Sequence, residues 1–172
     1  WYGGIGIVSL VAIILAVTLG GGSSGGAAPN FHITLYQGDN KLGAHNLDLA
    51  DLTGRPVVLN FWAGLCPPCR AEMPDLQDFY HEFKDKVTLI GIDLGQFTGL
   101  GTQNYARNLL IQLGITYPAG FTNDASVIQR YEVLAMPTTY FITSHGRIFR
   151  KSSGVTNEGI LLKTLGEMLD SS

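Results

Sequence analysis

The apolar residues of this chain recur in patterns that predict alternating strands and helices. Nearly continuous apolar runs with β-branched residues, at 56–62 and 87–93, are typical of central strands buried on both faces. Period-two alternation at 31–35 predicts an opening strand or hairpin, and the runs 139–143 and 147–151 around a Ser-His-Gly turn predict an antiparallel hairpin. These patterns predict one sheet that contains parallel and antiparallel pairs.

Helical periodicity separates the predicted strands. Apolar residues three and four positions apart predict a long helix from near Cys66 to about residue 84, with a kink at Pro74. A second helix ends at Gly114, and a short one lies near 124–131. The apolar faces of the second and the last helix are predicted to hold Tyr105, Leu109, Leu113, Leu161, Leu165 and Leu169. Strand, helix, strand, helix is the order of an α/β fold.

The first 22 residues contain no charged side chain. Residues 5–19 are apolar apart from Ser9 and Thr18. At ~1.5 Å per residue the segment is roughly 33 Å long, enough to cross a hydrocarbon core of about 30 Å. We therefore expect a transmembrane anchor at 1–22, with the lipid bilayer as its partner. A cleaved signal peptide is the alternative, but its apolar core is only about 7–15 residues long.

A Gly- and Ser-rich stretch, 23–30, follows the predicted anchor and is typical of a flexible linker. The remaining residues, 31–172, are enough for one folded domain. The chain has 11 Lys and Arg against 14 Asp and Glu, a net charge of −3. Nucleic-acid binding needs clustered basic residues, so we expect no nucleic-acid partner.

The two cysteines stand as Cys66-Pro-Pro-Cys69, where a buried strand meets the long helix. Unpaired N–H groups and a partial positive charge at a helix N-terminus stabilise a thiolate and lower its pKa. We therefore expect Cys66 to be the nucleophile. Cys69, one turn later, is placed to resolve a mixed disulfide. Such a dithiol needs no cofactor and no metal.

Three other interpretations of the cysteine pair fit the sequence less well. Half a zinc site would need a second ligand pair, but the chain has no further cysteine and its histidines show no paired ligand spacing. A purely structural disulfide in so short a loop stabilises little. Inert buried thiols disagree with the helix-starting context. Redox chemistry therefore fits best.

Two segments resemble a known family. Residues 57–74, VVLNFWAGLCPPCRAEMP, resemble the active-site segment of the membrane-anchored TlpA/ResA family of thiol-disulfide oxidoreductases. Residues 136–142, MPTTYFI, are similar to that family's cis-proline segment. The resemblance covers nearly all of 29–170. It implies an α/β, thioredoxin-like fold in which helices flank a central mixed sheet.

The resemblance also implies which residues form the site. Cys66, Cys69 and Pro137 would be catalytic, with a cis peptide bond between Met136 and Pro137 beside the cysteines. The Met136 backbone would then pair with a substrate strand. The residues expected to support this site are Asn60, Trp62, Pro67, Pro68, Gln96, Met136 and Thr138.

The chain departs from the family pattern around the dithiol. Leu65 stands where members usually carry Trp before the first cysteine, and Asn60 stands where thioredoxins hold a buried Asp. Gln96 occupies the place where some members have Glu. Asp93 or Glu72 could substitute as a proton acceptor, although we expect Glu72 to be a surface carboxylate.

Two further expectations concern this region. Without a nearby base, the Cys69 proton is expected to leave through water. The glycine-rich segment 95–101 does not end in Lys-Ser/Thr, so it is no phosphate loop, and we expect it to be a flexible connection beside the site.

The function expected from these features is that of a membrane-tethered dithiol reductase. Pro67 and Pro68 lack N–H donors for a Cys66 thiolate, which favours the disulfide and makes the dithiol the better reductant. The resemblance implies protein disulfide substrates such as apocytochromes c, and a membrane electron donor. It places the domain on the outer face of the cytoplasmic membrane, with a single-pass anchor.

Other classes of function remain open at this point. The chain could be an accessory or structural subunit of a larger membrane complex that retains the fold. A copper chaperone similar to the Sco proteins could use His145 or His32 as a metal ligand. However, three residues separate the two cysteines of Sco proteins, whereas two separate Cys66 and Cys69 here. A peroxidase is disfavoured because the Thr that peroxiredoxins place before their reactive cysteine is absent here.

Overall fold

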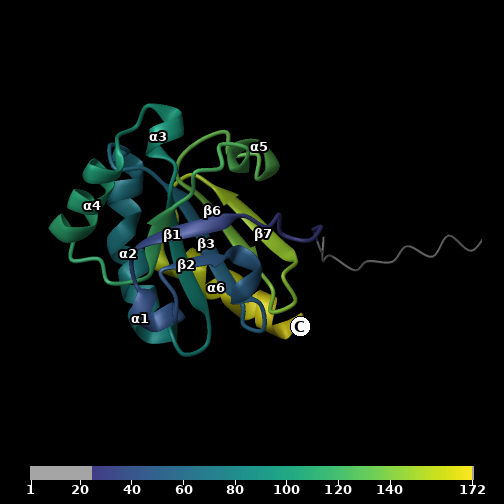
Figure 1. Cartoon of the computed structure of the whole chain (residues 1–172). Coiled ribbons are helices and arrows are strands. Elements are labelled where there is room, and N and C mark those ends of the chain that lie inside the picture. The colour runs from purple at the N-terminus through teal and green to yellow at the C-terminus, as the bar shows by residue number, and fades with distance from the viewer. Residues whose placement is uncertain (1–24, 172) are drawn as a thin grey trace, which may run out of the picture.

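The computed structural model describes residues 25–171, which form a seven-stranded sheet flanked by helices (Figure 1). The strand order is β2-β1-β5-β4-β3-β6-β7. The strands are β1 (His32–Gln37), β2 (Asn46–Asp48), β3 (Val57–Trp62), β4 (Thr88–Asp93), β5 (Ala119–Phe121), β6 (Thr138–Ile142) and β7 (Ile148–Ser153). The helices are α1 (Asp39–Leu42), the 3-10 helix η1 (Leu49–Leu52), α2 (Pro67–Phe83), α3 (Gly95–Thr98), α4 (Gln103–Gln112), α5 (Val127–Arg130) and α6 (Glu158–Asp170).

The sheet is mixed, which confirms the predicted α/β architecture. β3, β4 and β5 are parallel neighbours, while β6, β7, β1 and β2 pair antiparallel with theirs. All six residues of β3 are buried, as the continuous apolar run predicts for a central strand. Parallel neighbours bring their carboxyl ends to one edge, so Trp62 lies opposite Asp93 there.

Two apolar cores lie on the two faces of the sheet. On one face, α2, α4 and α6 cover a core that includes Trp62, both cysteines and Leu165. On the other face, α5 and η1 cover a core that includes Phe61 and Tyr131. Because side chains of a strand alternate between faces, Asn60 and Trp62 point toward α2, whereas Phe61 points away from it.

The helix faces differ in detail from the predicted ones. Tyr105 is 52% exposed, and Ala106 is buried in its place. In α6, Leu169 is 43% exposed, while Met168 is buried behind Leu161 and Leu165. Leu109, Leu161 and Leu165 are buried as predicted, so the pattern is wrong at one position of each helix, where an exposed apolar side chain costs little.

The described part of the predicted linker is attached to the domain. The Gly25 N–H donates to the Ile148 carbonyl at 2.9 Å, and the Ala28 N–H donates to the Gly146 carbonyl at 2.9 Å. The Tyr131 hydroxyl donates to the Pro29 carbonyl at 2.7 Å. Residues 25–29 are therefore held against the start of β7 and against Tyr131, and the expectation of a flexible linker is wrong for them.

The anchor expected at 1–22 lies outside the described residues. Within 25–171, none of the helices is long and apolar enough to cross a bilayer.

Gly120 is predicted to be required where β5 pairs with β1. A Cβ at this position would lie 2.3 Å from the Thr34 carbonyl oxygen, a backbone atom in the neighbouring strand. Gly120→Ala should lower the free energy of unfolding by about 2–3 kcal/mol. The matched control is Gly166→Ala in α6, where a Cβ meets nothing within 4 Å; it should raise stability by about 1 kcal/mol. Urea titration of both variants measures this, and a neutral Gly120→Ala would contradict it.

Candidate active site

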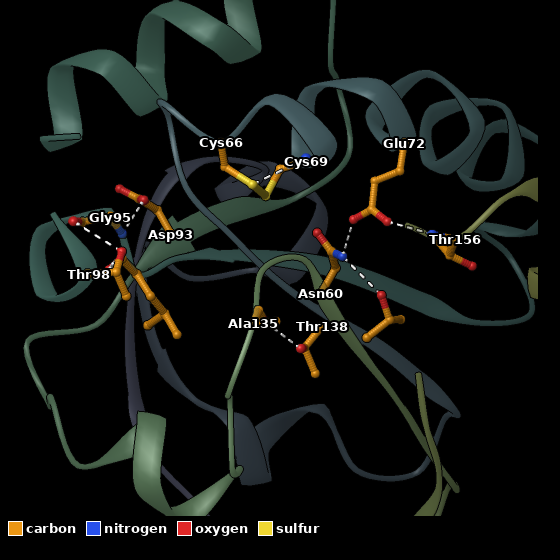
Figure 2. The surroundings of a disulfide bond; sticks show 12 residues. Asn60, Cys66, Cys69, Glu72, Asp93, Gly95, Thr98, Ala135, Thr138 and Thr156 are labelled. Atoms are coloured by element: carbon orange, nitrogen blue, oxygen red, sulfur yellow. Dashed lines mark hydrogen bonds between the residues drawn. A yellow bond between two sulfur atoms is a disulfide. The ribbon is translucent and has the colours of Figure 1, made fainter. Parts of the chain in front are cut away.

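A disulfide between Cys66 and Cys69 stands where β3 turns into α2 (Figure 2). Cys66 is the N-cap residue, and Pro67 and Pro68 fill the first two helical positions, where neither can donate an N–H. The Cys69 N–H donates to the Cys66 sulfur at 3.2 Å. Cys66 is 4% exposed and Cys69 is fully buried. Partners therefore reach Cys66 first, and one backbone donor is aimed at its sulfur.

The segment before β6 completes the surroundings of the disulfide. The Met136–Pro137 peptide bond is cis, as the family resemblance implied. The Gly154 N–H donates to the Pro137 carbonyl at 2.9 Å. The buried Thr138 hydroxyl donates to the Ala135 carbonyl at 2.7 Å (Figure 2). Hydrogen bonds on both sides of Pro137 fix this segment.

Glu72 is buried, so the expectation of a surface carboxylate is wrong. It lies one turn of α2 beyond Cys69 and is 1% exposed. Its Oε1 accepts from the Asn60 side-chain amide at 2.7 Å, and its Oε2 accepts from the Thr156 N–H at 2.8 Å (Figure 2). The same Asn60 amide donates to the Thr139 hydroxyl at 3.0 Å. Asn60 is thus a positioning group for a buried carboxyl, not a base.

Burial controls the protonation of Glu72. Loss of water around the carboxyl raises the pKa of Glu72 to about 7, against the opposing effect of the hydrogen bonds from Thr156 and Asn60. The charge of Asp75 raises it further. A carboxyl one turn from Cys69 can therefore take up or release a proton near neutral pH.

Asp93 is the second buried carboxyl near this end of the sheet. Its Oδ1 accepts from the Gly95 N–H at 2.8 Å, and its Oδ2 accepts from the Tyr36 hydroxyl at 2.9 Å. Burial raises the pKa of Asp93. The Arg107 guanidinium lies 4.4 Å from the centre of the Tyr36 ring. Both oxygens of Asp93 are thus engaged in holding β1 and the start of α3.

Gln96 takes no part in the hydrogen bonds around the disulfide. Its side-chain amide donates to the Thr122 carbonyl at 2.7 Å. The segment expected to be a flexible connection instead forms α3, and the Leu100 carbonyl that follows accepts from the Leu65 N–H at 2.8 Å. The expectation is wrong because this backbone hydrogen bond ties the segment to the residue before Cys66.

Three features of the candidate site were not predicted from the sequence: the burial of Glu72, its hydrogen bond with Thr156, and the contact of Leu65 with Leu100. Helical spacing offered a usable signal for Glu72, because a residue three positions after a buried Cys69 shares its face. Thr156 is 84 residues away along the chain, and nothing in the local pattern marks it.

The fold and the site together define a class: thioredoxin-fold thiol-disulfide oxidoreductases. Residues 24–151 match the AhpC/TSA family, so the chain belongs to this family. Thiol-disulfide oxidoreductase ResA of Oceanobacillus iheyensis is 38% identical over 125 residues, which are 72% of this chain and 62% of that protein. ResA of Bacillus subtilis is 29% identical over 140 residues, 81% of this chain and 72% of that protein.

A solved structure supports the fold. StoA from Bacillus subtilis superposes with a TM-score of 0.66 at 20% identity, covering 80% of this chain and 97% of StoA. These relatives agree with the family resemblance of residues 57–74 and 136–142. The chain spans about 62% of the length of the Oceanobacillus protein.

The raised pKa of Glu72 predicts a specific pH dependence of stability. The folded state holds the proton up to about pH 7, whereas the unfolded carboxyl releases it near 4.5. The free energy of unfolding should therefore fall as pH rises from 4.5 through 7, by up to roughly 3 kcal/mol. Glu72→Gln should flatten this slope in urea titrations of the oxidised protein.

The matched control for this prediction is Asp78→Asn, an exposed carboxylate on the same helix, which should keep the slope of the wild type. Asp93, whose pKa is also raised, adds a slope of the same sign to all three proteins. An equal slope in the wild type and Glu72→Gln would contradict the prediction.

Proposed function

We propose that the chain reduces disulfides of partner proteins through a Cys66–Cys69 dithiol. The observation that carries this proposal is the position of Cys66 as N-cap of α2, with the Cys69 N–H donated to its sulfur. The same N–H supports a Cys66 thiolate once the bond is reduced, because a backbone donor and the helix N-terminus both favour the charged form.

The exchange proceeds in two displacements. The Cys66 thiolate attacks one sulfur of the partner's disulfide, a mixed disulfide forms, and the partner's other sulfur leaves as a thiolate. The Cys69 thiol then loses its proton and attacks the Cys66 sulfur, which releases the second partner thiolate and forms the Cys66–Cys69 disulfide. Two electrons pass to the partner, and a dithiol donor must return two electrons afterwards.

Glu72 is the proton acceptor for Cys69 in this proposal. Its carboxyl lies one helical turn away and exchanges a proton near pH 7. The ionised carboxylate can therefore receive the thiol proton in the second displacement. Once protonated, the buried carboxyl is neutral. Asn60 and Thr156 hold the two oxygens in place. Although Asn60 itself cannot accept a proton, Glu72 supplies the base that the site needs.

The cellular setting is also a proposal. The charge-free segment at 1–22 supports a single-pass anchor in the cytoplasmic membrane, with the folded domain on the outer face. Apocytochromes c are the proposed substrates, and a membrane protein dithiol is the proposed electron donor. The similarity to proteins named ResA supports a role in disulfide exchange.

The order of attack can be tested by trapping. Reduced Cys69→Ser should accumulate a mixed disulfide through Cys66 when it meets a peptide disulfide, because the resolving sulfur is gone. Reduced Cys66→Ser should trap far less, since Cys69 is fully buried. Mass spectrometry of the full chain after acid quenching gives the two yields. Equal trapping by both variants would contradict the assignment of Cys66 as the nucleophile.

The direction of electron flow can be tested by the reduction potential of the full chain. Because Pro67 and Pro68 withhold two N–H donors from the thiolate, we expect a potential below about −200 mV. Pro68→Ala restores one donor and should raise the potential by roughly 20–30 mV.

The control for this measurement is Pro74→Ala, which restores an N–H further along α2 and should leave the potential near the wild-type value. A wild-type potential near that of the strong oxidant DsbA, about −120 mV, would contradict a reductase. A pair that fails to equilibrate with dithiothreitol would instead favour an accessory subunit.

A further inference from the structure

A groove of about 630 Å³ opens beside the disulfide. Leu65 forms one side of it, and the loop after α3 and the first turn of α4 form the other. The polar side chains that line it are Gln96, Thr102, Gln103 and Asn104. Neither the chemistry of the dithiol nor the hydrogen bonds around Glu72 use this groove.

The groove and the approach to Cys66 share one lining residue, Leu65. Leu65 also lines a smaller hollow of about 260 Å³, together with Cys66, Pro67 and Arg70. Because Cys66 is only 4% exposed, a partner's disulfide must enter through this hollow. Leu65 is 48% exposed and lines both depressions, so a chain that flanks the partner's cysteine could pass over it into the groove.

The walls of the groove are held in place before any partner arrives. The Leu65 N–H donates to the Leu100 carbonyl at 2.8 Å. Gly101 has a φ of +114°, and a Cβ there would lie 3.1 Å from Leu65 Cγ. A Cβ on Gly64 would lie 2.5 Å from the Ala106 nitrogen. The close approach of these backbones leaves little to be ordered on binding, which favours affinity.

The chemistry of the groove selects neutral ligands. Among the residues that line it, none carries a charge, and the amides and the hydroxyl can both donate and accept hydrogen bonds. Neither of two neighbouring arginines lines the groove itself: Arg107 lies over the Tyr36 ring, and Arg70 lines the hollow at Cys66, where it donates to the Gln112 side chain at 3.1 Å. A charged side chain in the groove would therefore find no counter-ion among the residues that line it.

We propose that this groove binds an uncharged, polar segment of the partner protein beside its target cysteine, and so selects the substrates of the dithiol. The inference rests on the proposed exchange at Cys66, and it adds which kind of partner sequence the groove binds. Gln103 is the specificity residue, because it is half-buried on the α4 wall and its amide donates to the Gln96 side chain at 3.4 Å.

The test uses the reduced full chain and synthetic peptides with one cysteine, each linked as a mixed disulfide to thionitrobenzoate. Cys66 attacks the peptide sulfur and releases coloured thionitrobenzoate, and Cys69 then releases the peptide thiol and forms the intramolecular disulfide. The residues beside the peptide cysteine are Ser, Glu or Lys. Because a peptide's own charge changes the reactivity of its disulfide, the Glu-to-Lys rate ratio is compared between variants.

The decisive comparison is a charge exchange at Gln103. Gln103→Lys should raise the Glu-to-Lys rate ratio by roughly two- to fivefold over the wild type, and Gln103→Glu should lower it by a similar factor, the range supplied by a partly exposed ion pair. Asn40→Lys and Asn40→Asp are the matched controls. They make the same charge changes on the exposed surface of α1, at the opposite end of the sheet, and should leave the ratio unchanged (Figure 1).

The outcomes separate the two proposals. A ratio that moves in opposite directions with the two Gln103 variants, and not with the Asn40 variants, supports the groove as the substrate site. Exchange that proceeds with equal ratios in all five proteins overturns the inference and leaves the proposed function standing. Absence of exchange with every peptide overturns the proposed function, and the inference with it.

Discussion

The short junction between β3 and α2 is the constraint on which the site depends. The chain leaves a fully buried strand at Trp62 and begins a helix at Pro67, with the four residues 63–66 between them. Gly64 makes the close passage against α4 possible, since a Cβ there would strike the Ala106 backbone. The turn makes Cys66 the N-cap residue, so that a sulfur occupies the place where Ser, Thr, Asp or Asn usually caps a helix.

The same junction sets the direction of α2 and therefore the burial of Glu72. Once Cys69 faces the sheet, the residue three positions later faces it too, at the level of Asn60 in β3. A buried carboxyl without a cationic partner costs stability, and here two donors and a raised pKa limit that cost. An apolar residue would pack there with less penalty, and the proposed proton transfer from Cys69 gives a chemical reason for the carboxyl.

Local sequence patterns predicted the main strands and helices well. They did not predict the contacts between segments that are distant along the chain. The apolar runs located β3 and β4, helical spacing located α2, and the similarity of residues 136–142 to a known segment anticipated the cis bond before Pro137. The partner of Glu72 comes from the turn before α6, and the partner of Leu65 from the loop after α3. Periodicity indicates on which face of a helix or strand a side chain lies. It does not indicate which backbone group of a distant segment will contact that side chain.

The arrangement separates two tasks on opposite sides of the disulfide. Proton exchange, as proposed, is handled inside, by a carboxyl held between α2, β3 and the segment before α6. Substrate selection, as proposed, is handled outside, by a neutral groove between Leu65 and α4. The two sets share no residue, so substitutions in one should act nearly independently of the other. A site built this way can change its substrates through the loop after α3 while its proton chemistry, fixed in the core, remains the same.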